Sequence, residues 1–402
     1  MKQTASKKLK FVRVTQIAIA SAAFALLAAC GGGSDNNSSS STPTGGVKLQ
    51  VVSFGDSLSD VGTYAPVIQL SFGGGRFTTN PGEVWTQKVA EYYGGTLSAA
   101  YLGGFGQPLV AAGGYGYAQG GSRVDQPQGE GYAPNNMAAT TIPVTQQITE
   151  YLGAHSSFNS NQLVLMNGGA NDIFIQAQAV SDAGTAAATQ VLLSGGTPAA
   201  AQAAGQAASL AATPAALQAI GVAAGKFIGA VQQVIAAGAT HVVVSDVPDI
   251  KSTPQGVQSG AQGQQLFDAL TLTFNGALAQ AFASNKQVIY VSAYKWLDTS
   301  LASYQQLGFT VSNTGTACNL NAMGQAATTY ATQNPLVLQP GQTAASYGSQ
   351  FQSSLFCSPQ TYTVAGADQT YMFADLVHPS SHLQALFAQT VEQAIAATGL
   401  GK

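Results

Sequence analysis

The stretch Val51-Val52-Ser53-Phe54-Gly55-Asp56-Ser57-Leu58-Ser59-Asp60 decides the fold of this 402-residue chain. Its apolar run, Val51–Phe54, predicts a buried strand, and the small residues that follow predict a tight turn. Ser57 lies in that turn, so we expect its side chain at the carboxyl edge of a sheet. Ligand sites of α/β folds lie at this edge, which makes Ser57 a candidate nucleophile.

A second stretch, Asp375-Leu376-Val377-His378-Pro379, lies about 320 residues further along. Its carboxylate precedes the histidine by three residues, close enough to accept a hydrogen bond from the imidazole Nδ1–H. Serine, histidine and aspartate are the components of nucleophilic acyl transfer. We therefore predict that Ser57, His378 and Asp375 are catalytic. Asp172 is the alternative acid.

Two more blocks lie between these stretches. The run Leu163–Met166 predicts a strand that leads into Asn167-Gly168-Gly169-Ala170-Asn171-Asp172, and Tyr117-Ala118-Gln119-Gly120-Gly121-Ser122 is a glycine block. In this order, the four blocks resemble the signature blocks of the GDSL, or SGNH, esterase/lipase family. Shorter similarities occur at Thr79–Trp85 and Asp246–Asp249, and the resemblance covers roughly residues 47 to 398.

The resemblance implies a serine esterase or lipase that needs no cofactor and passes through an acyl-enzyme on Ser57. Carried over to this chain, the family's oxyanion hole would consist of the Ser57 N–H, the Gly120 N–H and the Asn171 side-chain amide. Gly121 is the alternative to Gly120, because two adjacent glycines leave the register open. The substrate would be an ester or acyl lipid.

Alternating strands and helices predict an α/β fold with a doubly wound parallel sheet, like the flavodoxin-like fold of SGNH hydrolases. We expect strands at Leu49–Phe54, Leu163–Met166, His241–Ser245 and Val288–Ser292. We expect helices at Glu83–Tyr93, Val144–Leu152, Pro214–Ala236 and Gln264–Ala283, with Thr213 and Pro214 starting the third.

Two regions have the composition of insertions. The Ala-rich tract Gln176–Ala212 predicts either a pair of small helices at the mouth of the site or a solvated hairpin without function. The second region, Asn313–Tyr371, is rich in Ser, Thr, Gln and Gly and contains Cys318 and Cys357. We expect it to be ordered and to pack near the loop that carries Asp375.

The amino end predicts export. Five basic residues precede an apolar stretch, Ile17–Ala29, which is too short for a comfortable membrane span. The ending Leu26-Leu27-Ala28-Ala29-Cys30 resembles a bacterial lipobox, with Cys30 lipidated; the alternative is an ordinary signal that leaves a free thiol. We expect a lipoprotein signal at 1–29, the lipidated Cys30 with a flexible Gly/Ser linker at 30–46, and one hydrolase domain at 47–402.

This organisation places the protein in the bacterial cell envelope, anchored by its lipid or else secreted. Gly31 favours the outer membrane, because an aspartate after the cysteine would favour retention in the inner membrane. We expect no second membrane span and a monomeric body.

Charge argues against a nucleic-acid partner. All 17 acidic residues lie beyond position 30, whereas 5 of the 14 basic residues precede it, so the chain from Cys30 onward carries 9 basic residues and a formal charge of −8. Such a field repels phosphate. Cys318 and Cys357 form an even pair in an oxidising compartment, which predicts a disulfide, with two buried thiols as the alternative.

We expect no metal. The chain has no Cys-x-x-Cys and no His-Glu-x-x-His pattern. His378 and His382 have the spacing of a helical metal pair, but no third ligand with suitable spacing is evident. His155 and His241 are expected at the surface or as caps.

Two other functions and one other enzyme fold compete with this interpretation. Family members with a similar first block include phospholipases and lipid acyltransferases, which pass the acyl group to an alcohol. A non-catalytic surface lipoprotein is a third reading, against which the four intact blocks argue. An α/β-hydrolase is disfavoured because the chain has no Gly-x-Ser-x-Gly pentapeptide.

Overall fold

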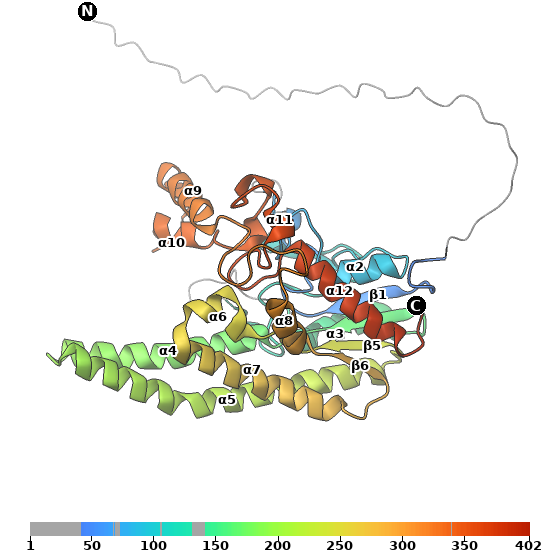
Figure 1. Cartoon of the computed structure of the whole chain (residues 1–402), viewed down its shortest axis with the longest axis horizontal. Coiled ribbons are helices and arrows are strands. Elements are labelled where there is room, and N and C mark those ends of the chain that lie inside the picture. Colours follow the sequence, from blue (N-terminus) through green and yellow to red (C-terminus); the bar gives the residue numbers. More distant parts are fainter. Residues whose placement is uncertain (1–41, 67, 69–72, 105–106, 131–140, 339) are drawn as a thin grey trace, which may run out of the picture. The chain divides into compact units, whose positions relative to one another are not determined.

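Four parallel strands form the central sheet of the computed structural model (Figure 1). They follow the order β1 (Gln50–Phe54), β4 (Gln162–Met166), β5 (Val242–Ser245) and β6 (Val288–Val291). Every residue of β4 and β5 is buried, as expected for parallel strands covered on both faces. The predicted α/β fold with a parallel sheet flanked by helices is confirmed, and the four predicted strands agree with the observed ones to within one residue at each end.

The structure describes residues 42–66, 68, 73–104, 107–130, 141–338 and 340–402. Within it, Thr42–Lys402 forms one compact unit. The predicted signal, Cys30 and most of the linker lie outside the described residues.

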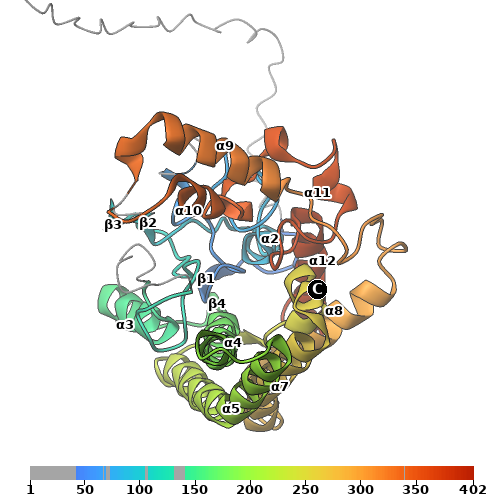
Figure 2. The ribbon, with the colours of Figure 1, turned by 90° about the vertical axis from the view of Figure 1, so that its left-hand side faces the viewer.

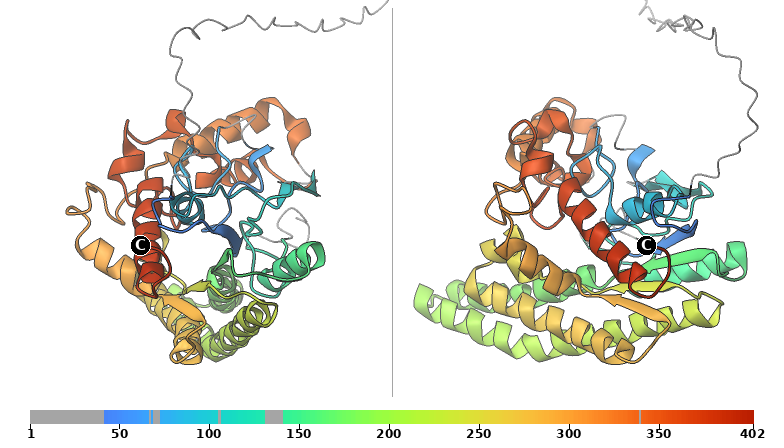
Figure 3. Two further views of the ribbon diagram at one scale, coloured as in Figure 1. Left: turned by 90° about the vertical axis from the view of Figure 1, so that its right-hand side faces the viewer. Right: turned by 45° about the vertical axis from the view of Figure 1, so that its right-hand side comes forward.

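Alternation along the strands produces one core on each face of the sheet. Val52, Val164 and Val242 belong to the core that α3 (Val144–His155), α5 (Pro198–Ala236) and α7 (Gly260–Phe282) cover. Leu163, Leu165 and Val243 belong to the core on the other face, which α2 (Trp85–Tyr92), α8 (Ala293–Ala302) and α12 (Ser381–Ala396) cover. Figures 1 and 3 show α5 and α7 on one side of the strands and α12 on the other.

Apart from the connection at Ser194–Thr197, the Ala-rich tract is helical and forms a hairpin of two long helices, so the expectation of a pair of small helices is wrong. The tract forms most of α4 (Ala170–Leu193) and the first part of α5. The two helices pack on each other as a long hairpin. Helix α5 begins at Pro198, capped by Thr197, and Pro214 lies inside it. Alanine has the highest helix propensity but gives little contrast between faces, which explains why periodicity did not predict the length of these helices.

Small residues let the two helices of the hairpin approach closely. A Cβ added at Gly184 would come 2.2 Å from the Ser209 hydroxyl and 3.0 Å from the Gly205 carbonyl oxygen. Among the described helices, α5 alone is long and apolar enough to cross a membrane by length and composition. The same helix buries Phe227 and Val231 in the core beneath the sheet, so composition alone is weak evidence for a membrane span.

The second insertion is ordered as predicted. It contains α9 (Leu320–Gln333), α10 (Ala344–Ser349) and α11 (Ala367–Thr370), with the 3₁₀ helices η3 (Pro335–Val337), η4 (Ser354–Phe356) and η5 (Pro359–Thr361). Seen from the carboxyl ends of the strands, α9 and α10 lie on one side of β1 and β4, and α4 and α5 lie on the other (Figure 2).

Three smaller elements complete the fold. The antiparallel hairpin of β2 (Tyr101–Gly104) and β3 (Gln107–Ala111) was not predicted. After β5, the chain forms the 3₁₀ helix η2 (Ile250–Ser252) and the short helix α6 (Pro254–Gln258) before it enters α7.

The predicted disulfide joins Cys318 to Cys357, both fully buried. It ties the start of α9 to the segment after η4, where the Ser354 N–H donates to Asp375 Oδ2 at 2.7 Å. The expectation that this insertion packs beside the Asp375 loop is confirmed.

Replacing both cysteines with alanine should lower the free energy of unfolding by about 4 kcal/mol, because the bond closes a 39-residue separation in the unfolded chain. Denaturant unfolding followed by circular dichroism measures this loss. The parent in strong reductant should behave like the double variant. An unchanged midpoint in both samples would show that the bond does not stabilise the fold.

Candidate active site

Ser57 lies in the turn that follows β1. Asp56 Oδ1 accepts the Leu58 N–H at 3.1 Å, and Asp60 Oδ1 accepts the N–H groups of Gly62 and Thr63. Asp56 and Asp60 therefore hold the turn, while Ser57 lines a cavity.

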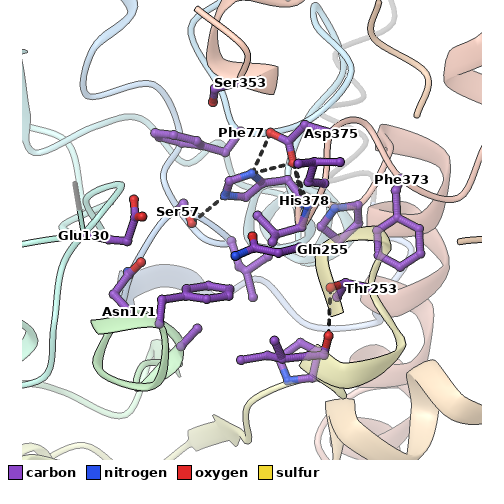
Figure 4. Close-up of a pocket in the computed structure, with 18 of the residues that line it drawn as sticks. Ser57, Phe77, Glu130, Asn171, Thr253, Gln255, Ser353, Phe373, Asp375 and His378 are labelled. Atoms are coloured by element: carbon purple, nitrogen blue, oxygen red, sulfur yellow. Dashed lines mark hydrogen bonds and ion pairs between the residues drawn. The ribbon is translucent and has the colours of Figure 1, made fainter. Parts of the chain in front are cut away.

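A continuous hydrogen-bonded chain connects the three predicted catalytic residues (Figure 4). Ser57 Oγ lies 2.9 Å from His378 Nε2, and His378 Nδ1 lies 2.8 Å from Asp375 Oδ2. The local sequence explains the second contact, because the Val377 and His378 N–H groups both donate to Asp375 Oδ1. This tight turn brings the carboxylate onto the imidazole.

The electrostatics of the pair suit a general base. Burial opposes the charge of the imidazole, but the Asp375 carboxylate outweighs it and raises the pKa of His378 above its usual value. Burial also opposes the charge of Asp375, yet the imidazole and the backbone N–H donors hold the pKa of that carboxyl well below its usual range. Asp375 is therefore ionised and able to orient the imidazole and stabilise its protonated form.

Asn171 occupies the first turn of α4, directly after the end of β4. Its side-chain nitrogen donates one hydrogen bond to the Ser122 carbonyl at 2.8 Å, which leaves its second N–H for a ligand. Ser57, Gly121 and Asn171 all line the same cavity. Within the described residues, the backbone N–H groups of Ser57 and Gly121 have no acceptor.

Gly120 does not have the place that the resemblance gave it. Its N–H donates to Asp60 Oδ2 at 2.8 Å and is not among the groups lining the cavity. A Cβ at Gly120 would lie 2.1 Å from the Phe77 ring, so this glycine is needed for packing. Gly121, at φ +82°, lines the cavity where Gly120 does not.

Sequence reasoning missed two side chains that support the nucleophile turn. Asn167 donates to Asp56 Oδ1 at 2.7 Å and accepts the Ser59 hydroxyl at 2.6 Å. Gln147 of α3 bonds both the N–H and the carbonyl of Gly55, at 2.9 and 2.8 Å. Asn167 could have been found as a polar residue that directly follows a buried strand. Gln147 offers no comparable signal.

The structure separates the other candidate residues from the site. Asp172, the alternative acid, pairs with Arg123 Nε at 2.9 Å and accepts the Val124 N–H. His382 lies in α12 with its Nδ1 on the Gln369 carbonyl, whereas His378 precedes that helix. The two histidines therefore do not form a helical pair.

His155 and His241 also lie apart from the catalytic chain. His155 ends α3 and stacks on Tyr115, and His241 precedes β5 at the opposite edge of the sheet. The described part of the chain holds no group of three His, Cys, Asp or Glu side chains that could bind a metal.

A cavity of about 280 Å³ opens beside Ser57. Its walls are largely apolar and come from the turn after β1, the segment after β5, α4 and α8, and the loop before α12; they include Leu58, Phe174, Pro248, Ile250, Trp296 and Phe373. Such a lining suits an acyl chain beside the nucleophile.

A family model described as GDSL-like lipase/acylhydrolase matches residues 51–391, which span all four sequence blocks and the whole site. The chain belongs to the GDSL-like lipase/acylhydrolase family. A comparison with curated proteins finds no match. Family membership supports a hydrolytic esterase or lipase function, and hydrolase is the enzyme class that follows.

The pH dependence of this GDSL-like hydrolase should follow His378, whose neutral form accepts the serine proton. Because Asp375 raises the pKa of His378, kcat/KM should reach half its plateau above about pH 6.5. Asp375→Asn removes the charge that raises this pKa, so the midpoint should move to lower pH while the plateau falls. Rates measured with a soluble ester whose alcohol does not titrate provide the test. A parent rate flat from about pH 5 to 9 would exclude histidine as the base.

Proposed function

We propose that this protein is a serine esterase or lipase that hydrolyses carboxylic esters through an acyl-enzyme on Ser57. The observation that carries the proposal is the 2.9 Å contact between Ser57 Oγ and His378 Nε2, with Asp375 on the far nitrogen of the same imidazole. A hydroxyl within hydrogen-bond reach of an oriented base is the arrangement that activates a serine.

The reaction begins when His378 Nε2 takes the Ser57 hydroxyl proton as Oγ attacks the ester carbonyl carbon. The imidazolium then gives this proton to the leaving alcohol oxygen, and the acyl group remains on Ser57. Water, deprotonated by the same imidazole, attacks the acyl carbonyl; the bond to Ser57 Oγ breaks, the imidazolium returns the proton to Oγ, and the acid is released. Asp375 keeps its negative charge throughout and stabilises the imidazolium.

Three donors would stabilise the tetrahedral oxyanion: the N–H groups of Ser57 and Gly121 and the Asn171 amide. Their support is that all three residues line the cavity at the nucleophile and that each has an N–H without an acceptor in the described structure. Removing one such donor typically costs about 3–4 kcal/mol of transition-state stabilisation.

Transfer of the acyl group to an alcohol is the second candidate. Both outcomes share the acyl-enzyme, and the mouth of the cavity next to Ser57 would admit either water or an alcohol. A chain-length series of esters, run with and without an added alcohol, separates them by whether a new ester appears.

Ser57→Ala should abolish formation of the acyl-enzyme and reduce turnover to background, and His378→Ala should be about as severe because the two residues act as a unit. Asn171→Ala should leave a measurable remnant, reduced about 10²–10³-fold, since two backbone donors remain. Steady-state rates with a chromogenic ester measure these effects. Mass spectrometry after treatment with a phosphonate ester should find the adduct on Ser57.

Ser194→Ala, an exposed serine in the α4–α5 connection, is the matched control and should keep parental activity. Ser59 is a poorer control, because it is buried and bonded to Asn167. An adduct on any serine other than Ser57, or full activity in Ser57→Ala, would overturn the assignment. A folded parent with no esterase activity would favour the non-catalytic alternative.

We also propose that the mature protein is anchored to the bacterial cell envelope, in the outer membrane, by lipid on Cys30. The support is the sequence Leu26-Leu27-Ala28-Ala29-Cys30 at the end of a basic and apolar leader. Two acyl chains at Cys30 would give stable anchoring where one would be marginal.

Cys30→Ser should abolish the incorporation of labelled palmitate and release the protein from the membrane fraction, because serine offers no thiol for the lipid. Labelling followed by fractionation of the cells gives the result, with Cys318→Ser as a control that removes a different cysteine. If the parent incorporates no palmitate, the lipobox interpretation is wrong.

A further inference from the structure

The catalytic cavity contains one acid that the reaction does not use, Glu130. Its backbone N–H donates to the carbonyl of Gly121 at 2.9 Å, which places it next to an oxyanion donor. In Figure 4 the Glu130 side chain lies beside Ser57, on the side opposite Phe373 and Thr253. This hydrogen bond holds the loop segment that contains Glu130 beside the glycine block.

No hydrogen-bond donor or basic side chain is paired with the Glu130 carboxylate in the described structure. Its carboxylate makes no hydrogen bond or ion pair there, and no Lys or Arg lines the cavity. The other acid of the cavity wall, Asp375, is occupied by His378 and by backbone N–H groups. Glu130 is exposed to solvent at the cavity mouth, so a ligand can reach it.

The charge of Glu130 interacts with the catalytic His378. The surrounding protein removes part of the water around the Glu130 carboxylate, which raises its pKa, while the nearby imidazole of His378 lowers it; in return, the carboxylate contributes to the raised pKa of His378. A negative field inside an apolar cleft attracts cations and repels anions. The excess of acidic over basic residues in the chain acts in the same direction.

The two halves of an ester therefore meet different surroundings at Ser57. Pro248, Ile250, Trp296 and Phe373 offer an apolar wall to the acyl chain. An acyl chain placed against the Glu130 carboxylate would lose hydrophobic contacts. The side of the cavity with Glu130 therefore suits the alcohol half of the ester. Phe77 lines the same cavity, with its ring 5.1 Å from that of His378, and offers an aromatic surface.

We propose that Glu130, together with the ring of Phe77, forms a subsite for a cationic alcohol half, an ammonium group two or three bonds from the ester oxygen. Carboxylates and aromatic rings are the two groups that bind an alkylated ammonium. The subsite sets which ester is preferred and takes no part in the bond-making steps. This inference rests on the esterase function proposed above.

Two butyrate esters of nearly equal shape test the proposal with the full-length protein. One is the choline ester, and the other is the dimethylbutyl ester, in which a carbon replaces the charged nitrogen. The parent should favour the choline ester in kcat/KM. Glu130→Gln should lower kcat/KM for the choline ester about tenfold, the equivalent of about 1.4 kcal/mol, and change that for the uncharged ester less than about twofold.

Glu91→Gln is the matched control, because Glu91 lies in α2, away from the cavity, and pairs with Lys88. It should leave both rates at the parental value. Added salt should weaken the preference for the choline ester in the parent and not in Glu130→Gln, since salt screens an exposed charge.

The outcomes are distinguishable. If the folded parent hydrolyses neither ester, the esterase function itself has failed. If the parent shows no preference for the choline ester, or if Glu130→Gln lowers both rates equally, the subsite is wrong while the esterase stands. Should Glu130→Gln fail to fold, competitive inhibition of the parent by tetramethylammonium, compared with tert-butanol, decides: equal inhibition overturns the proposal.

Discussion

The hydrogen bond from Asn167 to Asp56 is the constraint on which the catalytic geometry depends. Strands β1 and β4 pair in parallel, with Phe54 opposite Met166, so both chains leave the sheet at the same edge and level. Asn167 then bridges to Asp56 at 2.7 Å and accepts the hydroxyl of Ser59 at 2.6 Å. One amide thus links the loop that carries Ser57 to the loop that leads to Asn171. A shift in strand register would separate nucleophile and oxyanion donor together.

Several buried carboxylates lie at the carboxyl edge of the sheet, and they accept hydrogen bonds that hold the loops of the site. Asp60 collects the N–H groups of Gly62, Thr63 and Gly120, which joins the serine turn to the glycine block. Asp375 collects the N–H groups of Ser354, Val377 and His378 in addition to the imidazole. Burying a charge is costly unless it is hydrogen-bonded, and these donors offset the loss of water. The loops of the site are held by such bonds where they lack apolar contacts.

The two insertions contribute to the site in different ways. The disulfide-linked segment reaches the catalytic acid directly, through the Ser354 N–H, and so couples the order of a surface region to the orientation of His378. The α4–α5 hairpin contributes at its base, where α4 presents Asn171 and Phe174 to the cavity. Its distal part packs mainly on itself through small residues such as Gly184 and Gly205. The ester-binding surface is therefore assembled from the sheet edge and both additions.

The sequence alone determined those features of the fold and the site that depend on residues close together in the chain. Buried apolar runs gave the four strands, and the turn residues after β1 and β4 placed Ser57 and Asn171 at the carboxyl edge. The three-residue spacing of Asp375 and His378 was enough to predict their contact, because a short turn leaves the two side chains little choice. These features depend on neighbours in the chain, so the sequence carries them.

Tertiary structure decided what depends on distant partners. Only packing showed that the Gly120 N–H is bonded to Asp60 and that Gly121, and not Gly120, lines the cavity. Gln147 reaches Gly55 across 92 residues, and Glu130 comes beside Ser57 because its loop bonds to Gly121. The Ala-rich tract formed a helical hairpin because each helix had the other to pack on. Such contacts join segments whose separation along the chain says nothing of their separation in space.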